Sequence, residues 1–179
     1  MQIQTKRLLI RPFEINDLVL FKKLLTIPEL PGWQKQQERS KDFLQWHISN
    51  YNKMDLINGI CCFGIFNLTN SELFGAIGAG KHDDLGETEI FYQLLPSARR
   101  RGIATEAAQA VTHWVFSQYN MNYIIGTVGI DNIASQKVLE NCGFLLIEEK
   151  TLCVHITGET HRFLYYRKYK KSVGDLCKD

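Results

Sequence analysis

Long uncharged apolar runs are missing from this sequence of 179 residues. None approaches the roughly 20 residues that a membrane-spanning helix requires. The first twelve residues also lack the apolar segment that is typical of a signal peptide. These absences argue against a membrane protein and a secreted one, so we expect a cytoplasmic protein without a membrane partner.

Cysteine pairs with metal-binding spacing and an excess of one charge are also missing. No CxxC pair and no cysteine–histidine cluster with zinc spacing occurs among the five cysteines, which are Cys61, Cys62, Cys142, Cys153 and Cys177. We therefore expect reduced thiols and no metal. The formal net charge of +2 is close to balanced, so we expect no nucleic-acid partner. A balanced net charge still allows a small anionic ligand, because a local cluster of positive charges is enough to bind it.

What is present is the composition of a globular protein, with 45% hydrophobic and 22% charged residues. The length fits one domain, which we expect to span residues 1–179 with a polar tail over 170–179. No internal repeat or low-complexity linker interrupts it. The chain is long enough to bury a core without disulfides or metal.

The first third of the chain predicts one strand and two helices. Residues 8–10 form a short apolar run that Pro12 closes, as at the end of a strand. Asn16 and Asp17 can cap a helix whose apolar residues follow at helical spacing. Residues 27–40 predict a loop or broken helix, after which Ser40 can cap a second helix with apolar positions at 43, 44, 47 and 51.

The rest of the chain predicts six further strands and two helices. Apolar runs typical of strands occur at residues 60–66, 73–79, 88–95, 123–128, 144–154 and 162–169. Helical spacing begins at about Thr105 and recurs over 133–141, where Gly143 ends the helix. The predicted fold is therefore α/β (α+β), with strands and helices mixed along the chain.

A basic loop between a strand and a helix carries the first chemical signal. Arg99, Arg100 and Arg101 precede Gly102 and Ala104, and the helix opens directly afterwards. A helix start offers unpaired backbone N–H groups and partial positive charge, which suit a diphosphate. Glycine lets the backbone approach phosphate closely, and arginine can bind it with two hydrogen bonds. Three consecutive arginines also occur on ordinary surfaces, so both interpretations stay open here.

A second strand–helix junction contains Asn132 and Ser135, followed by Gly143 and Phe144. Taken alone, Asn132 is typical of a helix cap and Ser135 of a first-turn polar residue. Together with the arginine loop, however, this segment resembles the GNAT superfamily of N-acetyltransferases. Arg99-x-x-Gly102-x-Ala104 matches the family's diphosphate motif, and Asn132-x-x-Ser135 with Gly143-Phe144 matches its C-terminal motif. The opening residues 5–12 resemble the branch that contains ribosomal-protein-alanine N-acetyltransferases (RimJ/RimL-like).

The resemblance implies a mixed, mostly antiparallel sheet with splayed middle strands and about four flanking helices. It also implies acetyl-CoA as co-substrate, with its pantetheine arm paired to the backbone of Gln93, Leu94 and Leu95. One N–H there would polarise the thioester carbonyl. Asn132 and Ser135 would contact the pantetheine. The diphosphate would lie on the loop and first turn formed by Arg99, Arg100, Arg101, Gly102, Ile103, Ala104 and Thr105.

Direct acetyl transfer to an amine requires a base, since an ammonium ion has no lone pair. By resemblance, Glu89 on the central strand is our candidate base. Glu87, expected on the same strand face, and His82 are further candidates, although all three can be simple surface groups. Many family members keep a tyrosine as acid where this chain has Leu139, so Ser135 becomes the candidate hydroxyl. Cys142 has no histidine partner, and we predict no acetyl-cysteine intermediate.

The acceptor would be a primary amine, either a protein N-terminus or a small molecule. Trp33, Trp46 and Tyr51 could line its site, although such aromatic residues more often pack in the core. A homodimer is possible by family resemblance. Two alternatives remain: a module that binds acetyl-CoA without turnover, as sensor or assembly subunit, and a nucleotide-phosphate binder that uses the arginine loop.

Overall fold

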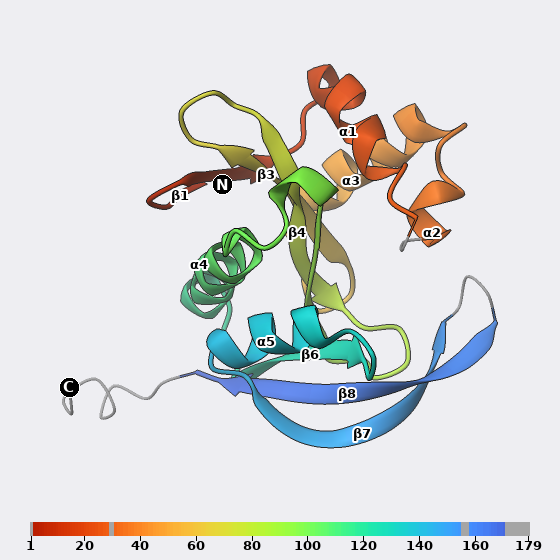
Figure 1. Ribbon diagram of the computed structural model, residues 1–179, viewed down its shortest axis with the longest axis vertical. Helices are drawn as coiled ribbons and strands as arrows, with labels where there is room; N and C mark the ends of the chain where they lie inside the picture. Colours follow the sequence, from red (N-terminus) through yellow and green to blue (C-terminus); the bar gives the residue numbers. More distant parts are fainter. Residues whose placement is uncertain (1, 29–30, 155–157, 171–179) are drawn as a thin grey trace.

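The computed structural model describes residues 2–28, 31–154 and 158–170, and these form one eight-stranded sheet with helices on both faces (Figure 1). Neighbouring strands follow the order β1-β2-β3-β4-β5-β6-β8-β7. The strands are β1 Ile3–Gln4, β2 Leu8–Pro12, β3 Ile60–Asn67, β4 Leu73–Lys81, β5 Thr88–Leu94, β6 Tyr123–Gly129, β7 Leu145–Val154 and β8 Glu159–Tyr169. The helices are α1 Leu18–Leu24, α2 Pro31–Gln34, α3 Ser40–Lys53, α4 Ile103–Gln118 and α5 Ile133–Asn141, with 3-10 turns at Ile15–Asp17 and Pro96–Ala98.

The sheet divides in its middle, between β5 and β6. This parallel pair is in register at a single position, Glu89 opposite Ile125. In contrast, β5 pairs with β4 along its whole length, and β6 pairs with β8 along its own. The β6-facing edge of β5 beyond Glu89 therefore has no ladder partner, as the predicted splay of the middle strands requires.

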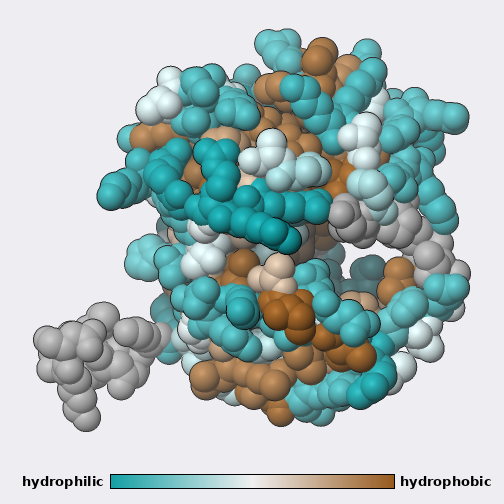
Figure 2. Space-filling view, in the orientation of Figure 1, coloured by the Kyte–Doolittle hydropathy of each residue, from teal (hydrophilic) through white to brown (hydrophobic). Residues whose placement is uncertain are grey.

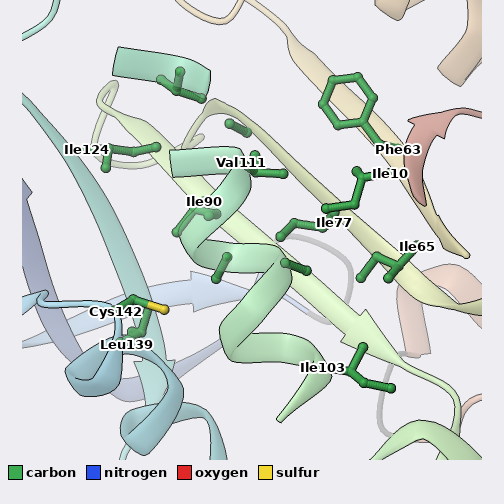
Figure 3. Packing of buried hydrophobic residues seen from close by; sticks show 14 of the residues in the cluster. Ile10, Phe63, Ile65, Ile77, Ile90, Ile103, Val111, Ile124, Leu139 and Cys142 are labelled. Atoms are coloured by element: carbon green, nitrogen blue, oxygen red, sulfur yellow. The ribbon is translucent and has the colours of Figure 1, made fainter. Parts of the chain in front are cut away.

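Alternating side chains along β3 build two apolar cores, one on each sheet face. Cys61, Phe63 and Ile65 join a cluster with α4, whose buried residues include Val111 and Val115 (Figure 3). Cys62 and Phe66 join a second cluster with α1 and α3. Both faces of the sheet are therefore covered, and the helix pair α4–α5 lies across the sheet from α1–α3.

Most predicted elements are confirmed, but several helix starts differ. Ser40 is the first residue of α3 and is buried, and the cap position belongs to Arg39. Asp17 makes no cap bond to α1; it accepts from the Glu14 N–H at 2.8 Å and pairs with Arg11 at 2.7 Å. Helix α4 begins at Ile103 rather than Thr105, because Gly102 already occupies the cap position.

Strand ends also differ from the sequence expectation. The two-residue β1 was missed, since two residues carry no periodicity, and β8 begins at Glu159, three residues earlier than predicted. Residues 171–179 of the predicted tail, including Cys177, lie outside the described residues. In the part of the chain that the structure describes, no helix is long and apolar enough to cross a membrane.

Candidate functional site

A cavity of about 1270 Å³ opens where the sheet divides. Figure 2 shows the surface hollowed between the part that carries α1–α3 and the part that carries β7 and β8. Residues of β5, the arginine loop, the first turns of α4 and α5, and β8 line it. Ten of the twelve residues predicted to bind the cofactor are among them: Gln93, Leu94, Arg99, Arg100, Gly102, Ile103, Ala104, Thr105, Asn132 and Ser135.

The start of α4 supplies the anion-binding features of the cavity. Gly102 has φ +73°, a left-handed conformation that glycine adopts without strain, and Arg100 has φ +59°. The first intrahelical bond runs from the Glu106 N–H to the Gly102 carbonyl at 3.1 Å. The amides of Ile103, Ala104 and Thr105 therefore precede the helical ladder and stand at the positive end of the 16-residue helix.

Two residues predicted to bind the cofactor do not line the cavity, Leu95 and Arg101, and neither does the predicted base Glu89. The Arg101 guanidinium lies over the Phe74 ring, 5.1 Å from its centroid, and donates to the Ser97 carbonyl at 3.4 Å. The Leu95 N–H donates to the Phe74 carbonyl at 2.8 Å. Since that N–H is already bonded within the sheet, it is not free to pair with another chain or ligand.

The arginine loop is braced from the N-terminal segment. Arg7 donates through Nη1 to the Arg101 carbonyl at 2.9 Å and through Nε to Glu106 Oε2 at 2.6 Å. Thr5 Oγ1 donates to the other oxygen of Glu106 at 2.6 Å. Burial alone would raise the pKa of Glu106, but the bonds from Thr5 and Arg7 outweigh it and lower that pKa. A charged strut thus connects the first residues of the chain to the cap of α4.

Glu89 lies at the fork where β5 and β6 part. Its Oε1 accepts from the Thr127 N–H at 2.8 Å and from Thr127 Oγ1 at 2.6 Å. The carboxylate thus bonds a β6 amide two residues beyond the last position where the two strands pair. Burial raises the pKa of Glu89, against the opposing hydrogen bonds from Thr127. A buried carboxylate with a raised pKa is suited to accept a proton.

The other two base candidates have structural partners. Glu87 accepts from Tyr123 at 2.7 Å and Tyr165 at 2.9 Å and pairs with Arg167 at 3.1 Å. Burial favours a higher pKa for Glu87, yet these partners outweigh it and lower the pKa, which makes Glu87 a weaker base. His82 Nδ1 accepts from the Asp84 and Leu85 N–H groups and so stabilises its turn.

Asn132 and Ser135 occupy the positions that the motif predicted, and a residue we had not singled out joins them. Asn132 caps α5, accepting from the Ser135 N–H at 3.1 Å. Ser135 Oγ lies 2.7 Å from the hydroxyl of Tyr92, which comes from β5. The sequence offered no signal for Tyr92, because its partner is 43 residues away and adjacent strand positions point to opposite faces.

Leu139 and Cys142 are both buried. Leu139 is buried beneath Gly126, where a Cβ would come within 2.9 Å of its Cδ2. Cys142 ends α5, and its thiol lies 3.5 Å from the Thr105 carbonyl. Burial raises the pKa of this thiol to about 11, so it stays protonated and unreactive.

The predicted acceptor aromatics do not line the cavity. Trp33 packs against Phe43 at 5.3 Å between ring centroids, Tyr51 packs against Phe63 at 5.8 Å, and Trp46 lies on the outer side of α3, half exposed. The wall opposite the arginine loop is instead formed by residues 160–163 of β8. Periodicity alone could not show which stretch of that strand borders a cavity.

Neither the cavity nor the rest of the described chain contains a group of three or more His, Cys, Asp or Glu side chains that could hold a metal ion. The cavity instead presents backbone amides, arginines and hydroxyls. Arg99 and Arg100 stand at its basic end, near the start of α4, and Glu89 stands at the sheet fork.

Comparison with known proteins agrees with this arrangement. Residues 7–145 match the family described as acetyltransferase (GNAT) domain. The chain is 31% identical over 147 residues to the uncharacterized N-acetyltransferase YnaD of Bacillus subtilis strain 168, covering 80% of this chain and 82% of that protein. It is 38% identical over 100 residues to the uncharacterized N-acetyltransferase YjdG of the same strain, and this match spans 55% of each protein.

Solved structures show the same fold. RimL, a ribosomal L7/L12 alpha-N-protein acetyltransferase solved in complex with coenzyme A, aligns with a TM-score of 0.76. The alignment covers 94% of this chain and 98% of that one, at 18% identity. At this identity the likeness concerns the overall arrangement of helices and strands.

Proposed function

The chain belongs to the GNAT family of acetyltransferases, and from this premise we propose that it transfers an acetyl group from acetyl-CoA to a primary amine. Two observations on one strand carry the proposal: the amides that open α4 line the cavity together with the end of β5, and Glu89 lies earlier on β5, at its last position paired with β6. The first can bind an anionic carrier, and the second can accept a proton from an attacking amine.

Acetyl-CoA binding is supported by the polar groups along the cavity. The amides of Gly102 to Thr105, with Arg99 and Arg100, would hold the diphosphate. The backbone of β5 at Gln93 and Leu94, beyond its last pairing with β6, would pair with the amide groups of pantetheine as an added strand would; the Leu94 carbonyl, which accepts from Arg99 Nε at 3.2 Å, would have to exchange that bond. Leu95 is left out of this proposal, because its N–H is bonded to β4.

The reaction we propose is direct attack within a ternary complex. The neutral amine attacks the thioester carbonyl carbon, so that the C–N bond forms and the C–S bond breaks. The electron pair of the broken bond leaves on the CoA sulfur, and the proton lost by the amine passes to Glu89, directly or through a water. The raised pKa of Glu89, caused by its burial, supports this role.

The acceptor we propose is a primary amine on a protein N-terminus or a small molecule, in the cytoplasm. The RimJ/RimL-like branch is supported by the strut from Thr5 and Arg7 to Glu106, which belongs to the segments that resemble that branch. The neighbouring RimL structure is described as that of a ribosomal-protein N-acetyltransferase. A protein N-terminus is therefore the first acceptor class to test.

The experiment is thiol release from acetyl-CoA, measured with a panel of N-terminal peptides, free amino acids and small amines. We expect acetyl-CoA to bind by calorimetry, and at least one amine to stimulate thiol release above hydrolysis. Binding without turnover across a broad panel would favour the alternative of a catalytically weak acetyl-CoA-binding module. Absence of binding, or equal competition by ATP, would overturn the proposal.

A further inference from the structure

Tyr92 and Ser135 join β5 to α5 across the divided sheet. Tyr92 lies three residues beyond Glu89, on the stretch of β5 that no longer pairs with β6. Ser135 lies in the first turn of α5. Both residues line the cavity. At about 3.3 Å per strand residue, the Tyr92 backbone is roughly 10 Å from that of Glu89. Three residues along a strand place the two side chains on opposite faces of the sheet, so it is Tyr92 and Ser135, rather than Glu89, that border the cavity where the thioester would lie.

The hydrogen bond between the two hydroxyls can run in either direction. Tyr92 Oη is 2.7 Å from Ser135 Oγ, where either atom can donate, and 3.1 Å from the Ser135 carbonyl oxygen, where Tyr92 must donate. If Tyr92 donates to the Ser135 carbonyl, the Ser135 hydroxyl donates its hydrogen bond to Tyr92 Oη. If Tyr92 donates to Oγ instead, the Ser135 hydrogen is free to point at another acceptor.

Tyr92 keeps its proton throughout. Burial raises its pKa, although the hydrogen bond with Ser135 opposes the rise. The phenol is therefore a permanent donor and not a source of protons. A buried neutral donor on the far side of a serine oxygen restricts the serine hydroxyl to directions away from that donor.

Building on the proposed acetyl transfer, we infer that Tyr92 is a positioning residue: it donates to Ser135 Oγ, so that the Ser135 hydrogen bonds the sulfur of the departing CoA thiolate. No proton leaves either hydroxyl in this step. The sulfur carries the electron pair of the broken C–S bond, and the Ser135 O–H stabilises that charge. The amine proton still passes to Glu89, and the thiolate takes a proton from water after release.

The first test compares Tyr92→Phe with Tyr166→Phe as a matched control. Tyr166 also reaches from the sheet to α5, where its hydroxyl lies 3.4 Å from Glu140, outside the cavity. We expect Tyr92→Phe to lower the single-turnover rate at saturating acetyl-CoA about tenfold without changing the Kd for acetyl-CoA. Tyr166→Phe should stay within about twofold of the parent protein. A rate for Tyr92→Phe equal to that of Tyr166→Phe would overturn the inference.

The second test separates positioning from a loss of structure. In Ser135→Ala, Tyr92 still has the Ser135 carbonyl as acceptor, so no buried hydroxyl loses its last partner. If Tyr92 acts through Ser135, the double variant should be no slower than Ser135→Ala alone. Rate losses that multiply would mean that the two residues act independently, which contradicts the inference.

The third test changes the leaving group within one variant. The selenoester acetyl-seleno-CoA releases a selenolate, which is less basic than a thiolate and needs less stabilisation. We expect the defect of Tyr92→Phe to shrink to about twofold with this donor. An equal defect with both donors would mean that Tyr92 serves folding or binding only. If the parent protein itself releases no thiol, the proposed function fails; if it turns over and only these variant effects are missing, this inference alone fails.

Discussion

Among single residues, Glu89 has a structural role at the fork of the sheet and a proposed role as the base. Both of its hydrogen bonds from Thr127 fall on Oε1. Within the described residues, no hydrogen bond reaches Oε2. One oxygen thus joins β5 to β6 at the fork, and the other is the one that, under the proposed mechanism, would take up the proton of the amine. A substitution that keeps the hydrogen-bonding oxygen but removes the basic carboxylate can separate these two roles.

Glu89→Gln should lower kcat/KM about 100-fold, which is the scale of a lost general base, and leave the Kd for acetyl-CoA unchanged. The amide oxygen can still accept from Thr127, so the fork should persist. Because burial raises the pKa of Glu89 above 4.5, the parent activity should rise with pH through that higher pKa. The variant should lose this acidic limb, as pH profiles of thiol release would show.

Glu87→Gln is the matched control for that experiment. Glu87 lies two residues away, but it pairs with Arg167 and two tyrosines. Its replacement should lower the melting temperature while kcat/KM stays within about threefold of the parent value. A loss of activity as large as that of Glu89→Gln would remove Glu89 from its special role.

His47 is a second single residue with a testable effect, which concerns the stability of the fold rather than catalysis. The ring is 1% exposed, packs against Phe43 at 4.5 Å between centroids, and has no hydrogen-bond partner for either nitrogen among the residues that the structure describes. Burial lowers its pKa from 6.5 to about 4. Unfolding therefore binds a proton between these two pH values, and stability falls as pH drops through that window.

His47→Leu should remove part of this acid sensitivity. A shift of this size corresponds to ~3 kcal/mol between pH 6.5 and 4. We expect the urea-derived free energy of unfolding to fall less on acidification in His47→Leu than in the parent protein. The same change at His113, which is exposed on α4, serves as the matched control. Parallel curves for parent and His47→Leu would contradict the assignment.

At the scale of elements, the strut from the N-terminal segment fixes how α4 begins. Arg7 bonds both the Arg101 carbonyl and Glu106, which flank the cap residue Gly102. Because the Arg7–Glu106 pair is partly exposed, with side chains 48% and 20% accessible, it adds little to global stability. Its effect should instead fall on the position of the loop amides.

Arg7→Met should raise the KM for acetyl-CoA about fivefold with kcat nearly unchanged, since the loop would bind the diphosphate less well. Lys6→Met removes the same charge from the neighbouring exposed residue and serves as control. Steady-state kinetics at saturating amine would separate the two parameters. An equal rise in KM in both variants would point to general electrostatics rather than to the strut.

The elements also show what the sequence could predict. Helix and strand periods located most of the elements, since each depends on local spacing, and the glycine–arginine motif located the start of α4. The direction of the Arg101 side chain was not predictable, because it depends on Phe74 of a different strand. Tyr92 was missed for the same reason: its partner Ser135 belongs to a distant helix. The sequence could predict the elements themselves, but it could not predict the side-chain contacts between them.

At the scale of the whole molecule, the sheet consists of two parts, β1–β5 and β6–β8. They meet at the Glu89–Ile125 position, at the hydrogen bonds of Glu87 and Glu89, and through the packing of α4 on α5. Beyond the Glu89–Ile125 position β5 and β6 no longer pair. A ligand in the cavity would contact both parts at once, and we expect binding to connect them.

Hydrogen exchange can measure this connection. Saturating acetyl-CoA should slow exchange at the β5 amides beyond Glu89 and in the first turn of α4, because those N–H groups would gain partners. Amides of β3, already paired on both sides by β2 and β4, should change much less. At a ligand concentration about 100 times Kd, global stability should rise by ~2.7 kcal/mol. Protection confined to α4 would place the diphosphate but contradict the pairing of pantetheine with β5, since a strand-like partner must protect the edge along which it lies.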